Sequence, residues 1–160
     1  MIDHAKPARE NFLSGMTCAQ SVLCAFEDVT GLDRDTSMRI AASFGGGVGG
    51  LREMCGAVSG ALVVLGMARG WTDPDDEAAK SAHYERTQTF VRRFRDAEGT
   101  SVCAELLSAA GVVPGPGPAP RTPEYYTVRP CTRRVGTAAR LLDELLAEAR
   151  DASRGDVRPD

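Results

Sequence analysis

Residues 45–70 constrain the fold more than any other part of this 160-residue chain. Five of the six residues at 45–50 are glycine, and the run 55–68 that follows Arg52 and Glu53 contains no charged residue. A helix that is apolar on every side must be buried, because no face of it suits water. These 14 residues are fewer than the roughly 20 that a bilayer span requires. We therefore expect a buried central helix over residues 55–69 and no membrane segment.

Gly56 and Gly60 lie one turn apart on this central helix. Small residues at this spacing allow a second backbone to approach the helix closely. The neighbour can be another helix of the same chain. It can also be a second copy of the protein, so a homodimer is one expectation.

The remainder of the chain predicts helices, because apolar residues recur at helical spacing and no alternating run indicates a strand. Thr17 and Asp33 are candidate N-caps, and glycines follow several of the apolar stretches. Helices are expected over residues 3–13, 18–29, 34–44, 55–69, 75–97 and 130–150. A further short helix is expected to be capped by Thr100 or Ser101 and to carry Cys103, Leu106 and Leu107. Residues 112–128 form a Pro/Gly-rich loop, and residues 151–160 a flexible tail. The prediction is an all-α, single-domain bundle of six or seven helices over residues 1–150.

Composition and charge exclude some classes of function. The net charge of −3 and the pI near 5.4 give no electrostatic footprint for nucleic acid. The N-terminal residues lack the apolar core of a signal peptide, so we expect a cytoplasmic protein. Abundant Ala, Gly, Arg and Asp with few lysines point to a bacterial source. Five cysteines in a reducing compartment argue against a disulfide framework and leave catalysis, metal binding or plain burial.

Four of the five cysteines, Cys18, Cys55, Cys103 and Cys131, each fall in the expected first turn of a different helix. A helix N-terminus carries partial positive charge and free N–H donors, which favour a thiolate and lower its pKa. If the four helix starts converge, they form a site suited to thiolates or to an anionic cluster. Cys24 lies six residues after Cys18 and therefore points about 120° away, into the core.

Spacing alone leaves other functions open. All five cysteines can be buried packing residues, since free cysteine is among the most buried residue types. No Cys-x-x-Cys pair is present, so neither a thioredoxin-like motif nor a zinc ribbon is supported. One alternative is a non-redox binding or structural protein with buried or zinc-bound cysteines. Another is an enzyme that converts a small molecule in a helical pocket beside the glycine loop.

Several segments resemble the C_GCAxxG_C_C family of redox-active proteins: residues 15–20, 44–50 and 55–60, with Cys103 and Cys131. The resemblance covers about residues 5–148. The family's markers are four cysteines, one of them in a Cys-Gly-Ala-x-x-Gly motif, and they match Cys18, Cys55, Cys103 and Cys131 here. A similar domain occurs in a cytochrome said to carry an iron–sulfur centre, so one expectation from the resemblance is a [2Fe–2S] cluster held by the four cysteines.

The other redox interpretation is dithiol chemistry. A thiolate of low pKa, for which Cys55 is the candidate, would attack a disulfide, and a second cysteine would resolve the intermediate. In either case the electron donor or acceptor, or the small-molecule substrate, stays unidentified by the sequence.

The glycine loop contains the pattern Gly45-x-Gly47-x-x-Gly50. A dinucleotide site would need a strand before it, whereas a helix is expected there, and no Lys-Ser/Thr pair follows to make a phosphate-binding loop. We interpret the loop as a turn that brings backbone close to the cysteines. Gly45, Gly46, Gly47 and Gly56 are accordingly assigned to the wall of a cofactor site.

Other polar residues receive weaker assignments. His83 lies on the inward side of the helix at 75–97 and is interpreted as a hydrogen-bonded core histidine, with ligand and proton carrier as alternatives. His4 is near a chain end and is expected to be mobile and inert. Glu53 is expected to be an exposed carboxylate. Arg133 and Arg134 are interpreted as a solvated pair that could still favour a thiolate at Cys131.

Overall fold

The structure is a computed structural model that describes the backbone of residues 2–115 and 117–155, and the side chains of residues 2–115 and 117–149. Within these residues the chain is all-helical, and its β pairing is one isolated antiparallel bridge between Met54 and Val102. The helices are α1 (Ala5–Leu13), α2 (Cys18–Ala25), α3 (Glu27–Thr30), α4 (Arg34–Ala41), a 3₁₀ turn η1 (Ala42–Phe44), α5 (Gly56–Arg69), α6 (Glu77–Glu98), α7 (Cys103–Ser108), α8 (Pro123–Val128) and α9 (Cys131–Gly155). The predicted all-α class is confirmed.

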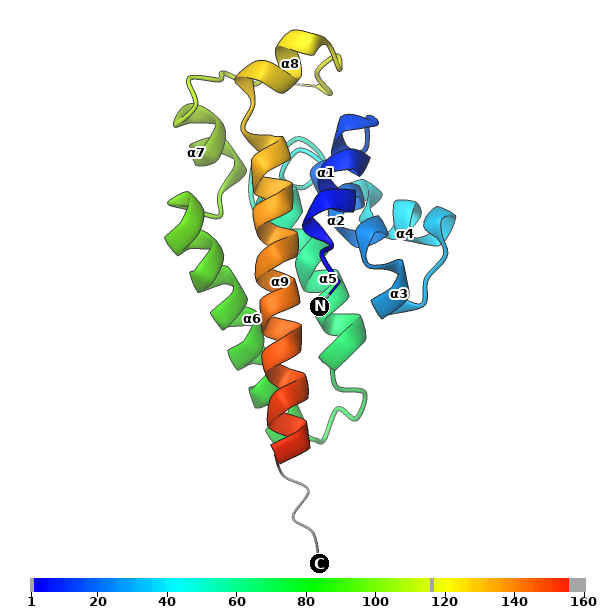
Figure 1. Ribbon diagram of the computed structural model, residues 1–160. Coiled ribbons are helices and arrows are strands. Elements are labelled where there is room, and N and C mark those ends of the chain that lie inside the picture. Colours follow the sequence, from blue (N-terminus) through cyan, green and yellow to red (C-terminus); the bar gives the residue numbers. More distant parts are fainter. Residues whose placement is uncertain (1, 116, 156–160) are drawn as a thin grey trace, which may run out of the picture.

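Three long helices, α5, α6 and α9, run side by side along the length of the molecule (Figure 1). The helices α1 to α4 pack on one side of this layer, with α2 against α5 and α1 against α9. Helices α7 and α8 lie at one end, and α5 and α9 both begin at that end (Figure 1). The starts of several helices therefore meet in one region of the fold.

Helix α5 is the buried centre that its composition predicts. Eight of its fourteen residues are buried, among them Gly56 and Gly60. A Cβ atom added at Gly60 would lie 2.6 Å from the carbonyl oxygen of Ala19 in α2, which is far inside van der Waals contact. The glycine-marked face is thus filled by α2 of the same chain, and it does not offer a surface to a second copy.

Three predicted boundaries are wrong. The helix expected over residues 18–29 is two helices, because the backbone turns at Phe26 (φ −108°, ψ 30°). The loop expected over residues 112–128 ends in a helix, α8, which begins with Pro123 and is capped by the Thr122 side chain. Helix α9 continues to Gly155 beyond the expected tail boundary at 151, and residues 156–160 lie outside the described part.

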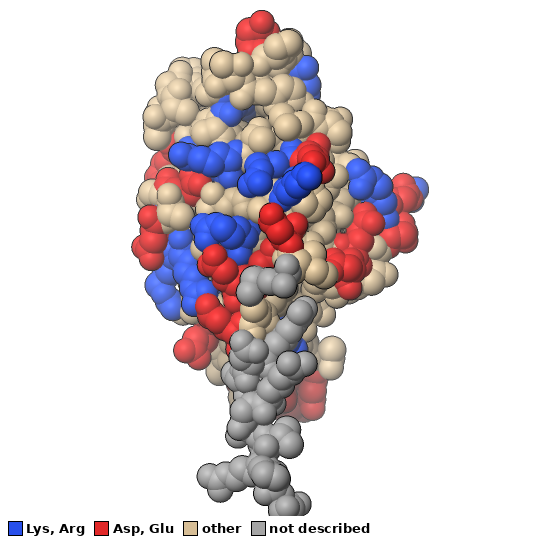
Figure 2. All heavy atoms as spheres, in the orientation of Figure 1, with Lys and Arg blue, Asp and Glu red and all other residues tan. Residues whose placement is uncertain are grey.

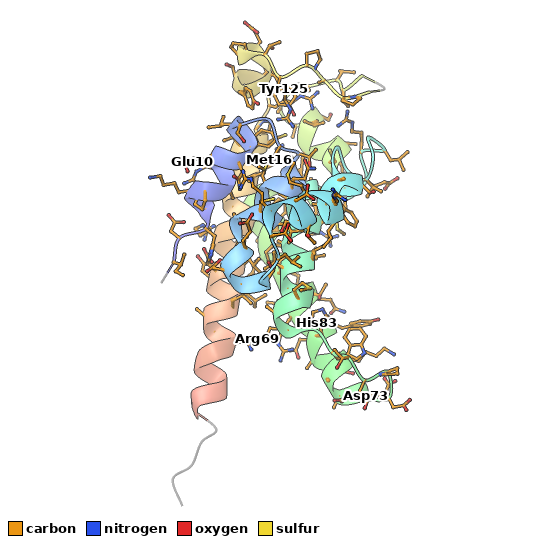
Figure 3. The ribbon with its side chains drawn as sticks, turned by 90° about the vertical axis from the view of Figure 1, so that its right-hand side faces the viewer. Glu10, Met16, Arg69, Asp73, His83 and Tyr125 are labelled. Atoms are coloured by element: carbon orange, nitrogen blue, oxygen red, sulfur yellow. The ribbon has the colours of Figure 1, made fainter. Side chains whose placement is uncertain are left out.

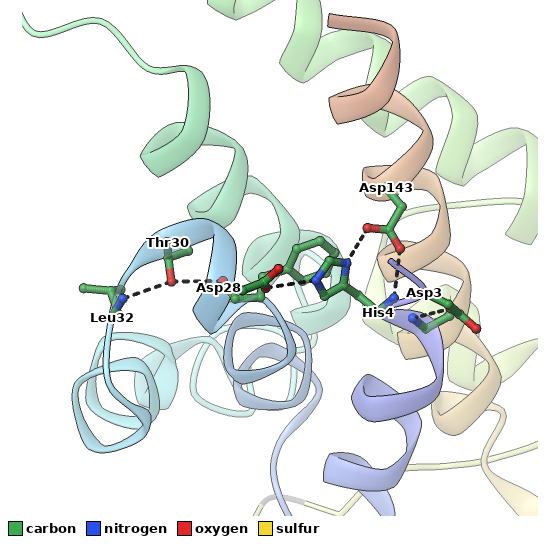
Figure 4. A network of polar contacts seen from close by, with 8 residues as sticks. Asp3, His4, Asp28, Thr30, Leu32 and Asp143 are labelled. Atoms are coloured by element: carbon green, nitrogen blue, oxygen red, sulfur yellow. Dashed lines mark hydrogen bonds and ion pairs between the residues drawn. The ribbon is translucent and has the colours of Figure 1, made fainter. Parts of the chain in front are cut away.

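The expectation that His4 is mobile is wrong. Its ring is buried and stacks on Phe26 with a centroid distance of 4.0 Å. One ring nitrogen, Nδ1, lies 2.5 Å from Asp143 in α9, and the other, Nε2, lies 3.0 Å from Asp28 in α3 (Figure 4). The backbone N–H of His4 also donates to Asp143. These contacts tie the start of α1 to two other helices, a role that sequence spacing did not reveal.

The surface carries charges of both signs. On the face seen in Figure 2, acidic and basic side chains are intermingled over the long helices and over α4. No helix in the described part of the chain is long and apolar enough to cross a membrane.

The contact between α2 and α5 yields a test with a matched control. Gly60→Ala is expected to lower the free energy of unfolding by about 1–3 kcal/mol or more, because the added methyl meets backbone that cannot move aside. Gly66→Ala lies in the same helix with nothing within 4 Å of its new Cβ, and is expected to stabilise by about 0.5–1 kcal/mol. Urea unfolding measures both, and equal effects would contradict the close contact.

Candidate functional site

The four helix-start cysteines lie around one cavity of about 330 Å³. Cys18 is the first residue of α2, Cys103 of α7 and Cys131 of α9, while Cys55 is the N-cap of α5. Cys24 is buried and lies outside this lining, as its position on the helix predicts. The structure therefore brings together the four cysteines that the sequence singled out.

A short antiparallel pairing aligns Cys55 with Cys103. The N–H of Cys55 donates to the Ser101 carbonyl (2.8 Å), and the N–H of Cys103 donates to the Glu53 carbonyl (2.6 Å). The bridge between Met54 and Val102 lies between these bonds. Segments almost fifty residues apart thus fix the starts of α5 and α7 against each other.

The glycine loop is a left-handed turn. The five residues at 46–50 all have positive φ, between 57° and 85°, and only one of them, Val48, is not glycine. Left-handed backbone costs L-residues free energy, which explains the glycine content. A Cβ on Gly47 would lie 2.6 Å from the Cys103 Cβ and 2.9 Å from the Arg52 backbone. The loop therefore lets backbone pass directly against a cysteine, as the sequence analysis expected, and the 3₁₀ turn η1 precedes it where a dinucleotide fold would have a strand.

Two of the other glycines assigned to the site, Gly45 and Gly56, pack against the start of α2, whereas Gly46 packs against Gly50 and Arg52. A Cβ on Gly45 would lie 2.7 Å from the Thr17 side chain, which caps α2, and a Cβ on Gly56 would lie 3.2 Å from the Cys18 Cβ. Gly45, Gly46, Gly47 and Gly56 all line the cavity. Because these glycines have no side chains, the backbone of the cavity wall can approach the cysteines closely.

Burial changes the expected order of thiol acidity. Hydrogen bonds from the N–H groups of Ala57 and Val58 lower the pKa of Cys55, but burial outweighs them and raises this pKa to about 12. The choice of Cys55 as the thiolate of low pKa is therefore wrong. Burial also raises the pKa of Cys103, although the Arg52 side chain beside it acts in the opposite direction.

Cys18 and Cys131 form a directly interacting pair. The hydrogen bond between their side chains is the largest influence on both groups: it raises the pKa of Cys18 well above its usual range and lowers the pKa of Cys131 to about 7. The positive charges of Arg134, Arg129 and Arg121 favour the Cys131 thiolate further. A half-buried cysteine that is ionised near neutral pH is thus held beside a protonated one.

Four arginines line the cavity: Arg52, Arg121, Arg129 and Arg134. Of these four, only Arg134 was considered near the site from the sequence, and its interpretation as a solvated residue is wrong, because it is 5% exposed. Arg133 is on the surface as expected, where it pairs with Glu98 at 2.7 Å. The nearness of Arg52 and Arg129 to cysteines in the sequence was an available signal. No neighbouring cysteine in the sequence marked Arg121, which lies in the proline-rich segment.

Aromatic rings hold Arg121 in place. Its guanidinium carbon lies 4.6 Å from the centre of the Phe12 ring and 4.5 Å from that of Tyr125, and one nitrogen, Nη2, donates to the Met16 carbonyl. Figure 3 shows Tyr125 and Met16 at the same end of the molecule. Arg129 lies over the Tyr125 ring as well, at 4.6 Å. These cation–π contacts fix two positive charges at the edge of the cavity.

Two other candidates lie apart from the cavity lining. His83 lies towards the opposite end of the molecule from Tyr125 (Figure 3) and contacts the Trp71 ring. It is half-buried, and its Nδ1 has no hydrogen-bond partner, so the interpretation as a hydrogen-bonded core histidine is wrong. The Glu53 side chain is exposed, as predicted.

Among the residues whose side chains are described, no three His, Cys, Asp or Glu side chains are arranged to hold one metal ion. The four cysteines share a cavity without forming such a group. The arrangement can instead support thiol chemistry at the Cys18–Cys131 pair.

These features define the class: a small all-α protein whose helix-start cysteines surround one cavity. Residues 16–145 match the model of a protein family described as "Putative redox-active protein (C_GCAxxG_C_C)". The match spans most of the chain, so the protein belongs to this family, and the resemblance noted in the sequence is confirmed. No curated protein and no solved structure matches the chain.

The contact of the glycine loop with Cys103 can be tested by two alanine substitutions. Gly50→Ala places a side chain on left-handed backbone with nothing within 4 Å, and is expected to cost about 1–2 kcal/mol of unfolding free energy. Gly47→Ala places a side chain on the same kind of backbone, and its Cβ also meets Cys103 and the Arg52 backbone. It is therefore expected to lower the unfolding free energy by about 1–3 kcal/mol more than Gly50→Ala. Equal losses in urea unfolding would mean that the loop does not pack on Cys103.

Proposed function

We propose that this protein is a thiol–disulfide redox protein in which Cys131 is the attacking thiolate and Cys18 the resolving thiol. The observation that carries the proposal is the Cys18–Cys131 pair, in which Cys131 has a pKa of about 7. An attacking thiol works best when its pKa is near the ambient pH, because the thiolate is then abundant and still a good nucleophile. The family's description as redox-active supports the same class of chemistry.

The proposed reaction consumes one disulfide. The Cys131 thiolate attacks one sulfur of the substrate, the substrate's S–S bond breaks, and the first thiolate leaves while a mixed disulfide forms on Cys131. Cys18 then gives its proton to the thiolate that left first and attacks the Cys131 sulfur, which releases the second half of the substrate as a thiolate that takes a proton from solvent. The substrate is reduced to two thiols and the protein is oxidised to a Cys18–Cys131 disulfide. A thiol or dithiol reductant must regenerate the protein.

An iron–sulfur cluster is the second candidate, and the convergence of four thiols on one cavity favours it. We rank it below thiol chemistry because the Cys18–Cys131 pair already places an ionised thiol beside a protonated one, which a dithiol reaction requires. The cavity's four arginines suit an anionic cluster and an anionic thiolate equally, so they do not separate the two candidates.

The acidity of Cys131 predicts a pH profile. Lowering a thiol's pKa makes the reactive thiolate present at lower pH, so alkylation of Cys131 by iodoacetamide is expected to rise through pH 7 and level off above about pH 8. The other four thiols have raised pKa values and should react slowly over this range. Peptide mass spectrometry after timed alkylation measures each cysteine separately.

Substitution of Cys18 tests whether its hydrogen bond causes the pH profile of Cys131. Cys18→Ala removes the hydrogen bond that most lowers the pKa of Cys131, so the midpoint is expected to move up towards the ordinary cysteine value. Cys24→Ala is the matched control, because Cys24 is buried outside the cavity, and its profile should equal that of the wild type. An unchanged midpoint in Cys18→Ala would contradict the assignment of the pair.

The redox step itself is tested with bis(2-hydroxyethyl) disulfide, an uncharged substrate, and protein purified and reduced without oxygen. The wild type and Cys24→Ser are expected to release two equivalents of mercaptoethanol and to gain a Cys18–Cys131 disulfide. Cys18→Ser is expected to stop at a mixed disulfide on Cys131, because no resolving thiol remains. Mass spectrometry without reduction identifies the linked residues.

Two results would overturn the proposal. One is a disulfide between other cysteines, or no reaction at all. The other is a coloured protein that holds about two iron atoms per chain after anaerobic purification, which would favour the cluster.

A further inference from the structure

We infer that the cysteine cavity binds a small organic anion through the guanidinium groups of Arg52, Arg121 and Arg134. The substrate of the thiol chemistry is then a disulfide that carries carboxylate groups. The substrate class rests on the proposed function, whereas anion binding does not require it.

Unused hydrogen-bond donors in the cavity wall point to an anionic ligand. Arg134 is 5% exposed; its Nη1 is buried without a hydrogen-bond partner, and its Nε has only the Glu98 carboxylate, 3.5 Å away. Nη1 of Arg121 and Nε of Arg52 are buried and unpartnered in the same way. Buried donors without partners are costly. The three arginines that carry them all line the cavity, so their guanidinium groups are close to an acceptor bound there.

The positive charge of the cavity lining also favours an anionic ligand. The lining includes four arginines and, among the described residues, no aspartate or glutamate. Glu98 is the carboxylate next to Arg134, with 3.5 Å between its Oε2 and the arginine Nε. Glu98 already accepts hydrogen bonds from Arg133 and Thr137. Arg52, Arg121 and Arg129 form no ion pair with any described side chain. The positive charge is therefore largely unbalanced, as in sites for carboxylates.

The cavity also limits the rest of the ligand. Its volume of about 330 Å³ is at the small end of ligand pockets. Apolar side chains, including Leu106, Leu107 and Pro118, line it together with the arginines and cysteines. A short apolar chain between charged ends fits this wall, and a central disulfide in that chain can meet Cys131.

Anion binding is tested with suberate, a dicarboxylate of six methylene groups that contains no sulfur. Isothermal titration calorimetry on the reduced protein is expected to detect suberate and not 1,8-octanediol, its uncharged counterpart. Arg121→Gln and Arg52→Gln are each expected to weaken suberate binding about tenfold, because each removes charge-assisted hydrogen bonds. Arg140→Gln is the control: it removes the same charge from an exposed residue that pairs with Glu144. Circular dichroism confirms that each variant is folded.

The substrate class is tested with three small disulfides that differ in charge: 3,3′-dithiodipropionate, bis(2-hydroxyethyl) disulfide and cystamine. The dianion is expected to oxidise Cys131 at least tenfold faster than the dication at low ionic strength, after correction for their rates with free mercaptoethanol. Added salt and Arg121→Gln should both reduce this preference.

The outcomes distinguish anion binding by the cavity from thiol chemistry at Cys131. Suberate binding without any disulfide reaction supports the anion site and overturns the thiol chemistry. Reaction with all three disulfides at equal corrected rates, without suberate binding, overturns the anion site and leaves the thiol chemistry standing. Equal loss of suberate binding in Arg140→Gln and Arg121→Gln also overturns the anion site, because it would show a dependence on net charge alone.

Discussion

The close approach of α2 to α5 is the contact on which the rest of the structure depends. Helix α5 can be central only because Gly56 and Gly60 have no side chains where Cys18 and Ala19 of α2 pass. This contact fixes the start of α2 beside the start of α5, and so places Cys18 near Cys55. Helix α9, which packs on both, then brings Cys131 to the same end of the bundle.

Within the cavity, two opposing effects decide which thiol can react. Helix N-termini and arginines stabilise a thiolate, while burial destabilises it. At Cys55 burial prevails and the pKa rises to about 12, although the helix supplies N–H donors. At Cys131 the Cys18 hydrogen bond and nearby arginines prevail, and the pKa falls to about 7. The same helix-start position therefore yields a protected thiol in one place and an ionised one in another.

Much of the fold could be predicted from local patterns. The apolar run at 55–68 indicated a buried helix, and Thr17 and Asp33 cap α2 and α4 as expected. The break at Phe26 was missed, and so was the helix at Pro123–Val128, although Thr122 and Pro123 give it a local start signal inside the proline-rich segment. His4 was misjudged because its partners, Asp28 and Asp143, are distant in sequence, and no local signal pairs them.

The sequence by itself determined the helical class, the burial of α5, and the four cysteines at helix starts, because these depend on composition and short-range spacing. Tertiary structure alone decided that Arg121, from the proline-rich segment, reaches the cysteine cavity, where it lies against the Phe12 and Tyr125 rings. It also decided that Cys131 rather than Cys55 is the acidic thiol. Both outcomes depend on burial and on charges brought from distant segments, and neither quantity can be calculated from neighbours in the chain.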